Sequence, residues 1–182
     1  MSLHFDVTLG DVHLPSGLLV SPLLTRTQLI NSCALKGISL HPYSLNSAPF
    51  RWFSVDGGFV GDEPLGAEFR FWGELLVNAD LHLDRGGESL DFVGTKKRHD
   101  VLLESQLGEP NELWDERLYS ENTSRLFPVY RYPWGKITSL QDGHVFIRVE
   151  YAGRRKAAEA KFQRINVPDQ LSVVERFRKR PR

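Results

Sequence analysis

A chain of 182 residues with 41% hydrophobic and 25% charged residues has the length and composition of one ordinary globular domain, which argues against disorder except at the ends of the chain. Its 23 basic and 23 acidic side chains cancel, which argues against a dedicated nucleic-acid binder, since such domains are usually strongly basic. The single cysteine, Cys33, excludes an internal disulfide and a cysteine-based zinc site.

The start of the chain carries no recognisable targeting signal. Residues 1–9 alternate apolar and polar side chains and lack the basic and apolar regions of a secretory signal. No apolar run reaches the ~18 residues that a transmembrane helix needs. We therefore expect a cytoplasmic protein without a membrane partner.

Charge is concentrated at the end of the chain. Residues 153–182 hold ten Lys or Arg and three Asp or Glu, so the preceding part carries the compensating negative charge. We predict a single α+β domain over residues 1–152 and a basic C-terminal segment, 153–182, with a short helix near 169–179. Nucleic acid is expected to bind, if at all, through this basic segment.

The first elements are a strand and a helix. Apolar residues at spacing two over 3–9 predict a strand. Thr25 and Gln28 form the capping-box pattern that begins a helix, and Gly37 provides its end. Cys33 lies on the apolar face of this helix, which favours a buried side chain over a reactive one.

Strands rich in aromatic residues follow over 47–84. The Asp-Gly-Gly string at 56–58 is typical of a hairpin turn, and the Pro-Leu-Gly string at 64–66 predicts another turn. The sequence therefore predicts a series of antiparallel strands in this part of the chain.

A second helix and a second set of strands follow. Thr95 is the predicted N-cap of the helix and Gly108 its end. Residues 109–122 are mostly polar and acidic and are predicted to form a long loop. The Asp-Gly pair at 142–143 predicts a hairpin turn, and the alternation over 145–151 predicts a strand.

The two halves of the chain share an order of parts. Each has a Thr-capped helix ending at glycine, followed by strands, and each has an aromatic-Arg-aromatic string before Trp-Gly, at 69–73 and 130–135. We predict pseudo-repeats over 14–84 and 90–152. The expected fold is a curved antiparallel sheet with two helices on one face and a C-terminal helix, an α+β protein built from a duplicated helix-plus-sheet unit.

Part of the second half resembles a known repeat. A helix that ends in Leu-Gly-Glu-Pro at 107–110 and is followed by antiparallel strands is similar to the repeat of β-lactamase-inhibitor-protein-like and SmpA/OmlA-like domains. The resemblance covers 95–151 and implies a protein-binding sheet surface. This sequence lacks the secretory or lipoprotein signal of those families, so their binding residues are not carried over.

Catalytic and metal-binding strings are absent from the sequence. There is no Gly-x-Ser-x-Gly, no phosphate-binding glycine loop and no His-Glu-x-x-His, so no catalytic residue, metal or cofactor is predicted. Histidine and aspartate do recur at spacing two, which would suit metal ligands or a base with its orienting carboxylate, or solvent-facing polar positions. The pairs are His4 with Asp6, Asp11 with His13, and His82 with Asp84.

Arginines and tryptophans provide the candidate binding residues. Arg51, Arg70 and Arg131 each lie between aromatic residues and would line one face of the sheet if their strands are neighbours. Such a face could bind phosphate or an acidic protein, although ordinary alternation produces the same pattern. Trp72 and Trp134 each precede glycine and are predicted to be packing residues or, if exposed, binding anchors.

Two functions remain open from the sequence. The first is a non-catalytic protein-binding module, for example an inhibitor or immunity-type protein that neutralises its partner. The alternative is a small enzyme or anionic-ligand-binding domain with its site on the sheet face. It would use the three arginines for the anion and His82 for acid–base chemistry.

Overall fold

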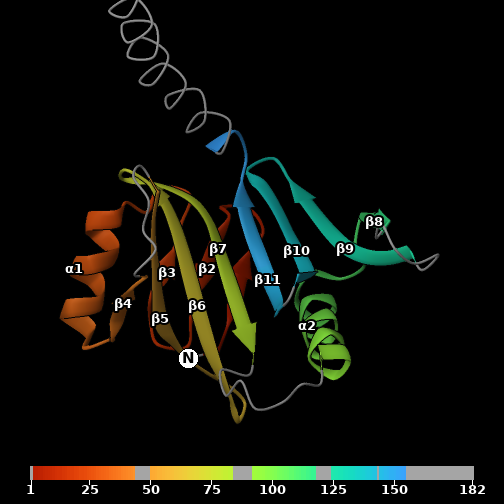
Figure 1. Ribbon diagram of the computed structural model, residues 1–182, viewed down its shortest axis with the longest axis horizontal. Coiled ribbons are helices and arrows are strands. Elements are labelled where there is room, and N and C mark those ends of the chain that lie inside the picture. Colours follow the sequence, from red (N-terminus) through yellow and green to blue (C-terminus); the bar gives the residue numbers. More distant parts are fainter. Residues whose placement is uncertain (1, 44–49, 84–91, 118–123, 143, 155–182) are drawn as a thin grey trace, which may run out of the picture.

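The computed structural model describes residues 2–43, 50–83, 92–117, 124–142 and 144–154 (Figure 1). These residues form two α-helices, an antiparallel sheet of three strands and an antiparallel sheet of eight strands. The predicted α+β fold with a curved antiparallel sheet is therefore confirmed. The predicted C-terminal helix lies outside the described residues.

The small sheet is formed by the first twenty residues. Its strands are β1 (His4–Asp6), β2 (Asp11–His13) and β3 (Leu19–Val20). The strand predicted over 3–9 ends at Asp6, because the carboxylate of Asp6 accepts hydrogen bonds from the backbone N–H groups of Thr8 and Leu9 and turns the chain.

Helix α1 (Arg26–Lys36) has the ends that the sequence predicts. The Thr25 hydroxyl accepts from the backbone N–H of Gln28, and the Gln28 side chain accepts from the backbone N–H of Thr25. Gly37 ends the helix at φ 65°, a left-handed conformation that favours glycine. Leu29 and Cys33 face the core.

The large sheet consists of two four-stranded meanders that meet at its centre. Each meander follows a helix, which matches the predicted duplicated helix-plus-sheet unit. The first meander follows α1 and the second follows α2 (Phe92–Leu107). The strands are β4 (Leu40–Pro42), β5 (Phe50–Val60), β6 (Glu63–Trp72), β7 (Leu75–Leu83), β8 (Glu112–Arg117), β9 (Ser124–Tyr132), β10 (Gly135–Asp142) and β11 (His144–Tyr151), in the spatial order β4-β5-β6-β7-β11-β10-β9-β8.

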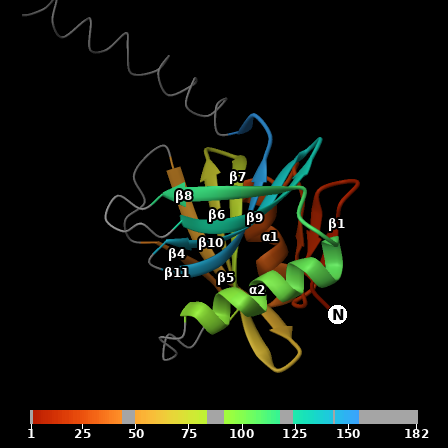
Figure 2. The same ribbon diagram turned by 90° about the vertical axis from the view of Figure 1, so that its right-hand side faces the viewer.

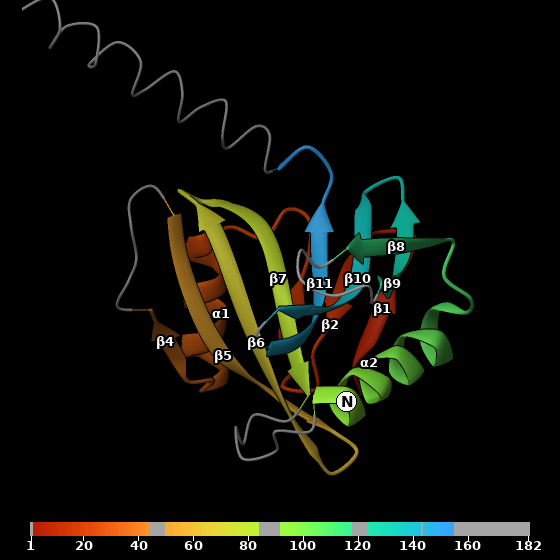
Figure 3. The ribbon, with the colours of Figure 1, turned by 45° about the vertical axis from the view of Figure 1, so that its right-hand side comes forward.

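The two aromatic-Arg-aromatic strings do not occupy equivalent strands of the two units. The string at 69–73 ends β6, the third strand of its unit, whereas the string at 130–135 ends β9, the second strand of its unit. Both strings nevertheless lead into hairpins at the same end of the sheet, because β7 and β10 both begin there (Figure 3). The two units therefore share the order of a helix followed by four antiparallel strands, but the aromatic-Arg-aromatic strings do not lie at equivalent positions in them.

The turns predicted at 56–58 and 64–66 lie inside long strands instead. β5 runs through the first string with a register shift between Asp56 and Gly58, and the chain reverses after Val60. A Cβ atom at Gly57 would lie 2.9 Å from side-chain atoms of Leu65, so this glycine permits close strand packing at the irregularity.

The segment 109–122, predicted as a loop, contains the edge strand β8. Six of its residues pair with β9. The polar, acidic composition of this segment did not predict a strand, because an edge strand exposes side chains that a central strand would bury. Leu113 and Trp114, for example, are 57% and 45% exposed. Helix α2 begins at Phe92, so the expected N-cap Thr95 lies inside it, while Gly108 at φ 77° ends it as predicted.

One face of the large sheet is buried. The small sheet and α1 lie behind it in Figure 1, and α2 crosses one end of the second meander (Figure 2). The Trp134 indole N–H donates to the Val7 carbonyl at 2.8 Å, and the Gln106 side chain on α2 donates to the Leu3 carbonyl at 2.8 Å, so the second helix and meander are attached to the N-terminal segment that forms the small sheet. The first meander is attached through the backbone N–H of Ser16, which donates to the Gly57 carbonyl at 2.8 Å. Among the described residues, no helix has the length and apolarity to cross a membrane.

Candidate functional site

The opposite face of the large sheet carries two parallel rows of polar side chains. Residues that face one another across neighbouring strands share a side of the sheet, so each row follows from the register. The first row is Trp52, Arg70, Asn78, Glu150, Lys136 and Arg131. The second row, two residues further along each strand, is Ser54, Glu68, Asp80, Arg148, Thr138, Val129 and Glu112.

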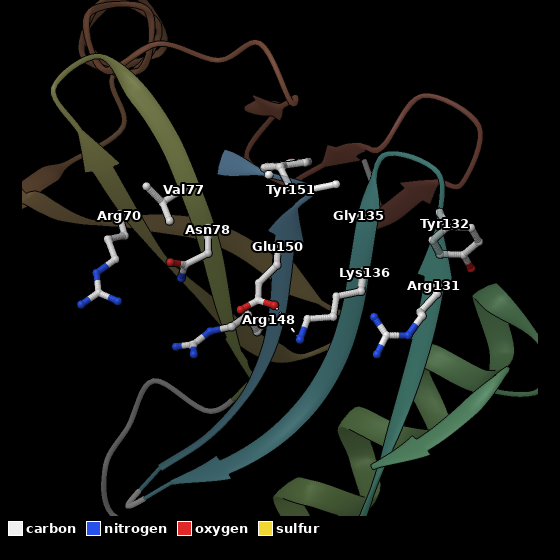
Figure 4. Close-up of a pocket in the computed structure, with 12 residues that line it drawn as sticks. Arg70, Val77, Asn78, Arg131, Tyr132, Gly135, Lys136, Arg148, Glu150 and Tyr151 are labelled. Atoms are coloured by element: carbon white, nitrogen blue, oxygen red, sulfur yellow. Dashed lines mark ion pairs between the residues drawn. The ribbon is translucent and has the colours of Figure 1, made fainter. Parts of the chain in front are cut away.

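The rows form the floor of a groove. Its main hollow has a volume of about 540 Å³ and lies over the first row (Figure 4). Four cations and one carboxylate line it: Arg70, Arg131, Lys136, Arg148 and Glu150. Smaller hollows adjoin it on both sides, one lined by Trp52 and the other by Trp114. We call this surface, from β5 to β8, the groove.

Ion pairs between neighbouring strands hold the floor in place. The Arg148 guanidinium donates two hydrogen bonds to the Asp80 carboxylate, both at 2.7 Å, and Asn78 donates to the same carboxylate at 3.1 Å. Lys136 lies 2.7 Å from Glu150. The bidentate pair joins β7 to β11, the two strands at which the meanders meet, so it fixes the centre of the groove.

Aromatic rings position Arg70 at one end of the main hollow. Its guanidinium carbon lies 4.2 Å from the ring centre of Trp52 and 5.1 Å from that of Phe50. A guanidinium stacked on aromatic faces keeps its N–H groups in the plane, where they can reach an anion.

Neighbouring side chains also determine the protonation state of two carboxyl groups of the second row. The Arg131 guanidinium, which donates to Glu112 through Nε and Nη2, lowers the pKa of that exposed carboxyl group. The imidazole of His82 and then the hydroxyl of Tyr43 lower the pKa of Glu68, although burial opposes them. Both carboxylates are thus held in the charged form.

The structure brings together two of the three predicted arginines. Arg70 and Arg131 line the main hollow, but Arg51 is on the other face, because it precedes Trp52 by one residue and successive side chains on a strand alternate. The expectation that all three share a face is therefore wrong for Arg51. Arg148 takes the third place, and the alternation over 145–151 was the signal that could have found it.

The predicted tryptophans are packing residues rather than exposed anchors. Trp72 is 7% exposed and its ring centre lies 4.8 Å from that of Phe50. Trp134 stacks on Tyr132 at 5.2 Å and donates its indole N–H to the small sheet. The tryptophans that line the groove are Trp52 and Trp114, which sequence analysis did not select because neither is followed by glycine.

The histidine–aspartate pairs do not converge on a metal site. His4 faces His13 and Asp6 faces Asp11 across the small sheet, away from the groove. His82 Nε2 lies 3.8 Å from Glu68 Oε1, and its predicted partner at position 84 is outside the described residues. In the part of the chain that the structure describes, no group of three or more His, Cys, Asp or Glu could hold a metal ion.

Comparison of the chain with protein-family models, with curated proteins and with solved structures finds no match. The resemblance to the β-lactamase-inhibitor-protein-like repeat therefore stays an expectation.

Proposed function

We propose that this chain is a non-catalytic protein-binding module that docks its partner on the groove and acts as an inhibitor or immunity-type protein. The observation that carries the proposal is the groove itself, which crosses seven strands on the face that the helices and the small sheet leave uncovered in the described structure.

The dimensions and composition of the groove suit a protein. Six strand spacings separate β5 from β8, which corresponds to roughly 29 Å along a flat sheet. Tryptophan and arginine are the residues most often found at the energetic centres of protein interfaces, and Trp52 and Trp114 lie near opposite ends of the groove. Ion pairs that already fix the floor reduce the entropy lost on binding.

A comparison of captured proteins tests this proposal. Tagged wild-type protein, Trp114→Ala and Lys136→Glu would be exposed to native extract of the cells that make the protein, with nuclease added. The matched control is Lys97→Glu, because Lys97 is exposed on α2 outside the groove. We expect one protein to be retained by the wild type and by the control and lost with both groove variants. Retention of the same proteins by all four would contradict the proposal.

A second function is favoured by one observation. The main hollow has the volume of a small-molecule site and is lined by four cations and one carboxylate, which suits an anionic ligand of a binding protein or small enzyme. A screen of carboxylates, phosphates and nucleotides by thermal unfolding tests it. A ligand that raises the melting temperature of the wild type, but not that of Lys136→Glu, would support this function, and no shift with any ligand would reject it.

A further inference from the structure

The two rows of the groove carry opposite net charges. The first row contains three cations, Arg70, Lys136 and Arg131, and one carboxylate. The second row contains three carboxylates, from Glu68, Asp80 and Glu112, and one cation. The floor is therefore polarised across its width, with a positive row beside a negative row.

The main hollow has a net positive lining, whereas both smaller hollows are lined by charges of both signs. The four cations of the main hollow face one carboxylate. The hollow beside Trp52 has two carboxylates, Glu68 and Asp80, and two arginines, and the hollow beside Trp114 has two carboxylates, Glu112 and Glu150, and three cations. Because the rows are two residues apart on each strand, about 7 Å separates them. One narrow segment of a partner can therefore contact both rows.

Two cations of the first row, Lys136 and Arg131, keep donors for a second carboxylate. Lys136 has three N–H donors, and its ion pair in the structure is to Glu150 alone among the described residues. Arg131 uses Nε and Nη2 for Glu112, and no hydrogen bond from its Nη1 is found in the described part of the chain. Arg131 is also exposed, so a partner can reach it.

We propose that the groove binds an extended peptide segment of a partner protein in which acidic and basic residues alternate. This inference rests on the proposed protein-binding function and specifies the partner. Successive side chains of an extended segment point to opposite sides, so carboxylates would lie over the first row while cations lie over the second. Apolar side chains at the ends of the segment would contact Trp52 and Trp114.

Nucleic acid is a poorer occupant of the same surface. A phosphate backbone that followed the first row would run beside the three carboxylates of the second row, about 7 Å away. Like charges at that distance oppose binding and would have to be offset by the cations alone. An alternating peptide satisfies both rows.

Direct titration of the isotope-labelled full chain tests the inference. The probe is a synthetic nine-residue peptide, acetyl-Trp-Gly-Glu-Lys-Glu-Lys-Glu-Gly-Trp-amide, which spans roughly 30 Å when extended. We expect saturable shifts of the backbone amide signals of Asn78, Lys136 and Glu150. The double variant Arg131→Glu/Lys136→Glu should weaken binding by roughly tenfold or more, whereas Lys97→Glu should leave it unchanged.

Two control ligands make the outcome decisive. One is the same peptide with every Glu replaced by Lys, and the other is tricarballylate, a small molecule with three carboxylates. Equal binding of the all-lysine peptide, equal affinity for tricarballylate, or shifts confined to other surfaces would overturn the inference, as would the absence of shifts at millimolar peptide. A partner captured through the groove would still support the proposed function after such a result, so the two failures are distinguishable.

Discussion

At the scale of single residues, a buried histidine determines how the protein responds to acid. His99 is fully buried on α2, and its Nε2 accepts the backbone N–H of Leu83 at 3.1 Å. Burial is the main reason why the pKa of His99 falls to about 3, and the nearby charges of His82, Lys96 and Arg98 add to it. The folded protein therefore keeps this imidazole neutral.

We predict a loss of stability in mild acid that depends on His99. The unfolded chain binds a proton below the usual pKa of 6.5, while folded His99 does not until about pH 3, so the free energy of unfolding falls as the pH drops through this window. The expected loss is about 2 kcal/mol between pH 7 and pH 5. Urea unfolding at both pH values would show it, and His99→Gln, which keeps an acceptor for Leu83 but does not titrate, should remove most of it. Equal losses in both proteins would count against this explanation.

Residue-scale prediction from sequence succeeded where the signal is local. The capping of α1 by Thr25 and its end at Gly37 depend on neighbouring residues and were predicted correctly. The predicted position of Arg51 was wrong, because an aromatic-Arg-aromatic string shows that side chains alternate between the two faces of the sheet but not which face is turned to the core. Which face is turned to the core is set by the neighbouring strands, which the string does not contain.

At the scale of elements, the contact between the small sheet and the β9–β10 hairpin depends on a glycine. Gly10 has φ 78°, and a Cβ atom there would lie 2.6 Å from Cδ2 of Trp134. The chain reverses between β1 and β2 at this point, and the Trp134 ring covers it. This contact explains the Trp-Gly string at 134–135 as a packing device rather than a binding one.

We predict that Gly10→Ala destabilises the protein by about 2–3 kcal/mol, because it adds a clash to the backbone strain of a left-handed residue. The matched control is Gly61→Ala, which has a similar φ of 61° but no atom within 4 Å of the added Cβ. Gly61→Ala should lower the free energy of unfolding only by the strain of a left-handed backbone, about 1 kcal/mol. Chemical denaturation of both variants measures the difference, and equal costs would show that Trp134 does not constrain this site.

The prediction of strands was wrong where the composition of a segment does not indicate that it pairs with another strand. The polar segment 109–122 was predicted as a loop, yet its residues from Glu112 to Arg117 pair with β9. The glycines at 57 and 58 were predicted as a turn, yet they permit an irregularity inside a long strand. Both errors arise because strand pairing is a long-range interaction that a single sequence segment does not specify.

At the scale of the whole molecule, two meanders are joined along β7 and β11. The shared order of parts in the two halves predicted a helix followed by antiparallel strands in each half, but not the edge strand β8. The row of charges across both meanders was only partly predicted, because it depends on the central pairing of β7 with β11. Three strands of the first meander and all four strands of the second form the groove, and the Asp80–Arg148 pair lies where the two meanders meet.

We predict that breaking this central pair costs more than breaking a pair at the edge. Asp80→Ala removes the bidentate pair with Arg148 from a mostly buried position, where the Asp80 side chain is 12% exposed and that of Arg148 is 28% exposed. We expect Asp80→Ala to lower the free energy of unfolding by about 2 kcal/mol. This is less than the loss expected for a fully buried pair, because solvent reaches Arg148. Glu112→Ala removes the exposed pair with Arg131 and should cost less than about 1 kcal/mol. Thermal and urea unfolding would compare the two, and equal costs would argue against a special role for the central pair.

The claim that the groove is the docking surface is tested most directly by site-specific photocrosslinking in the cells that make the protein. Trp114, which lines the groove, would be replaced by p-benzoylphenylalanine, which, unlike alanine, keeps a bulky aromatic side chain at this position, and the control position is Phe59, which is 62% exposed at the far end of β5. We predict that illumination crosslinks position 114, but not position 59, to one discrete protein. No crosslink at position 114, or the same set of products at both positions, would contradict the proposed function.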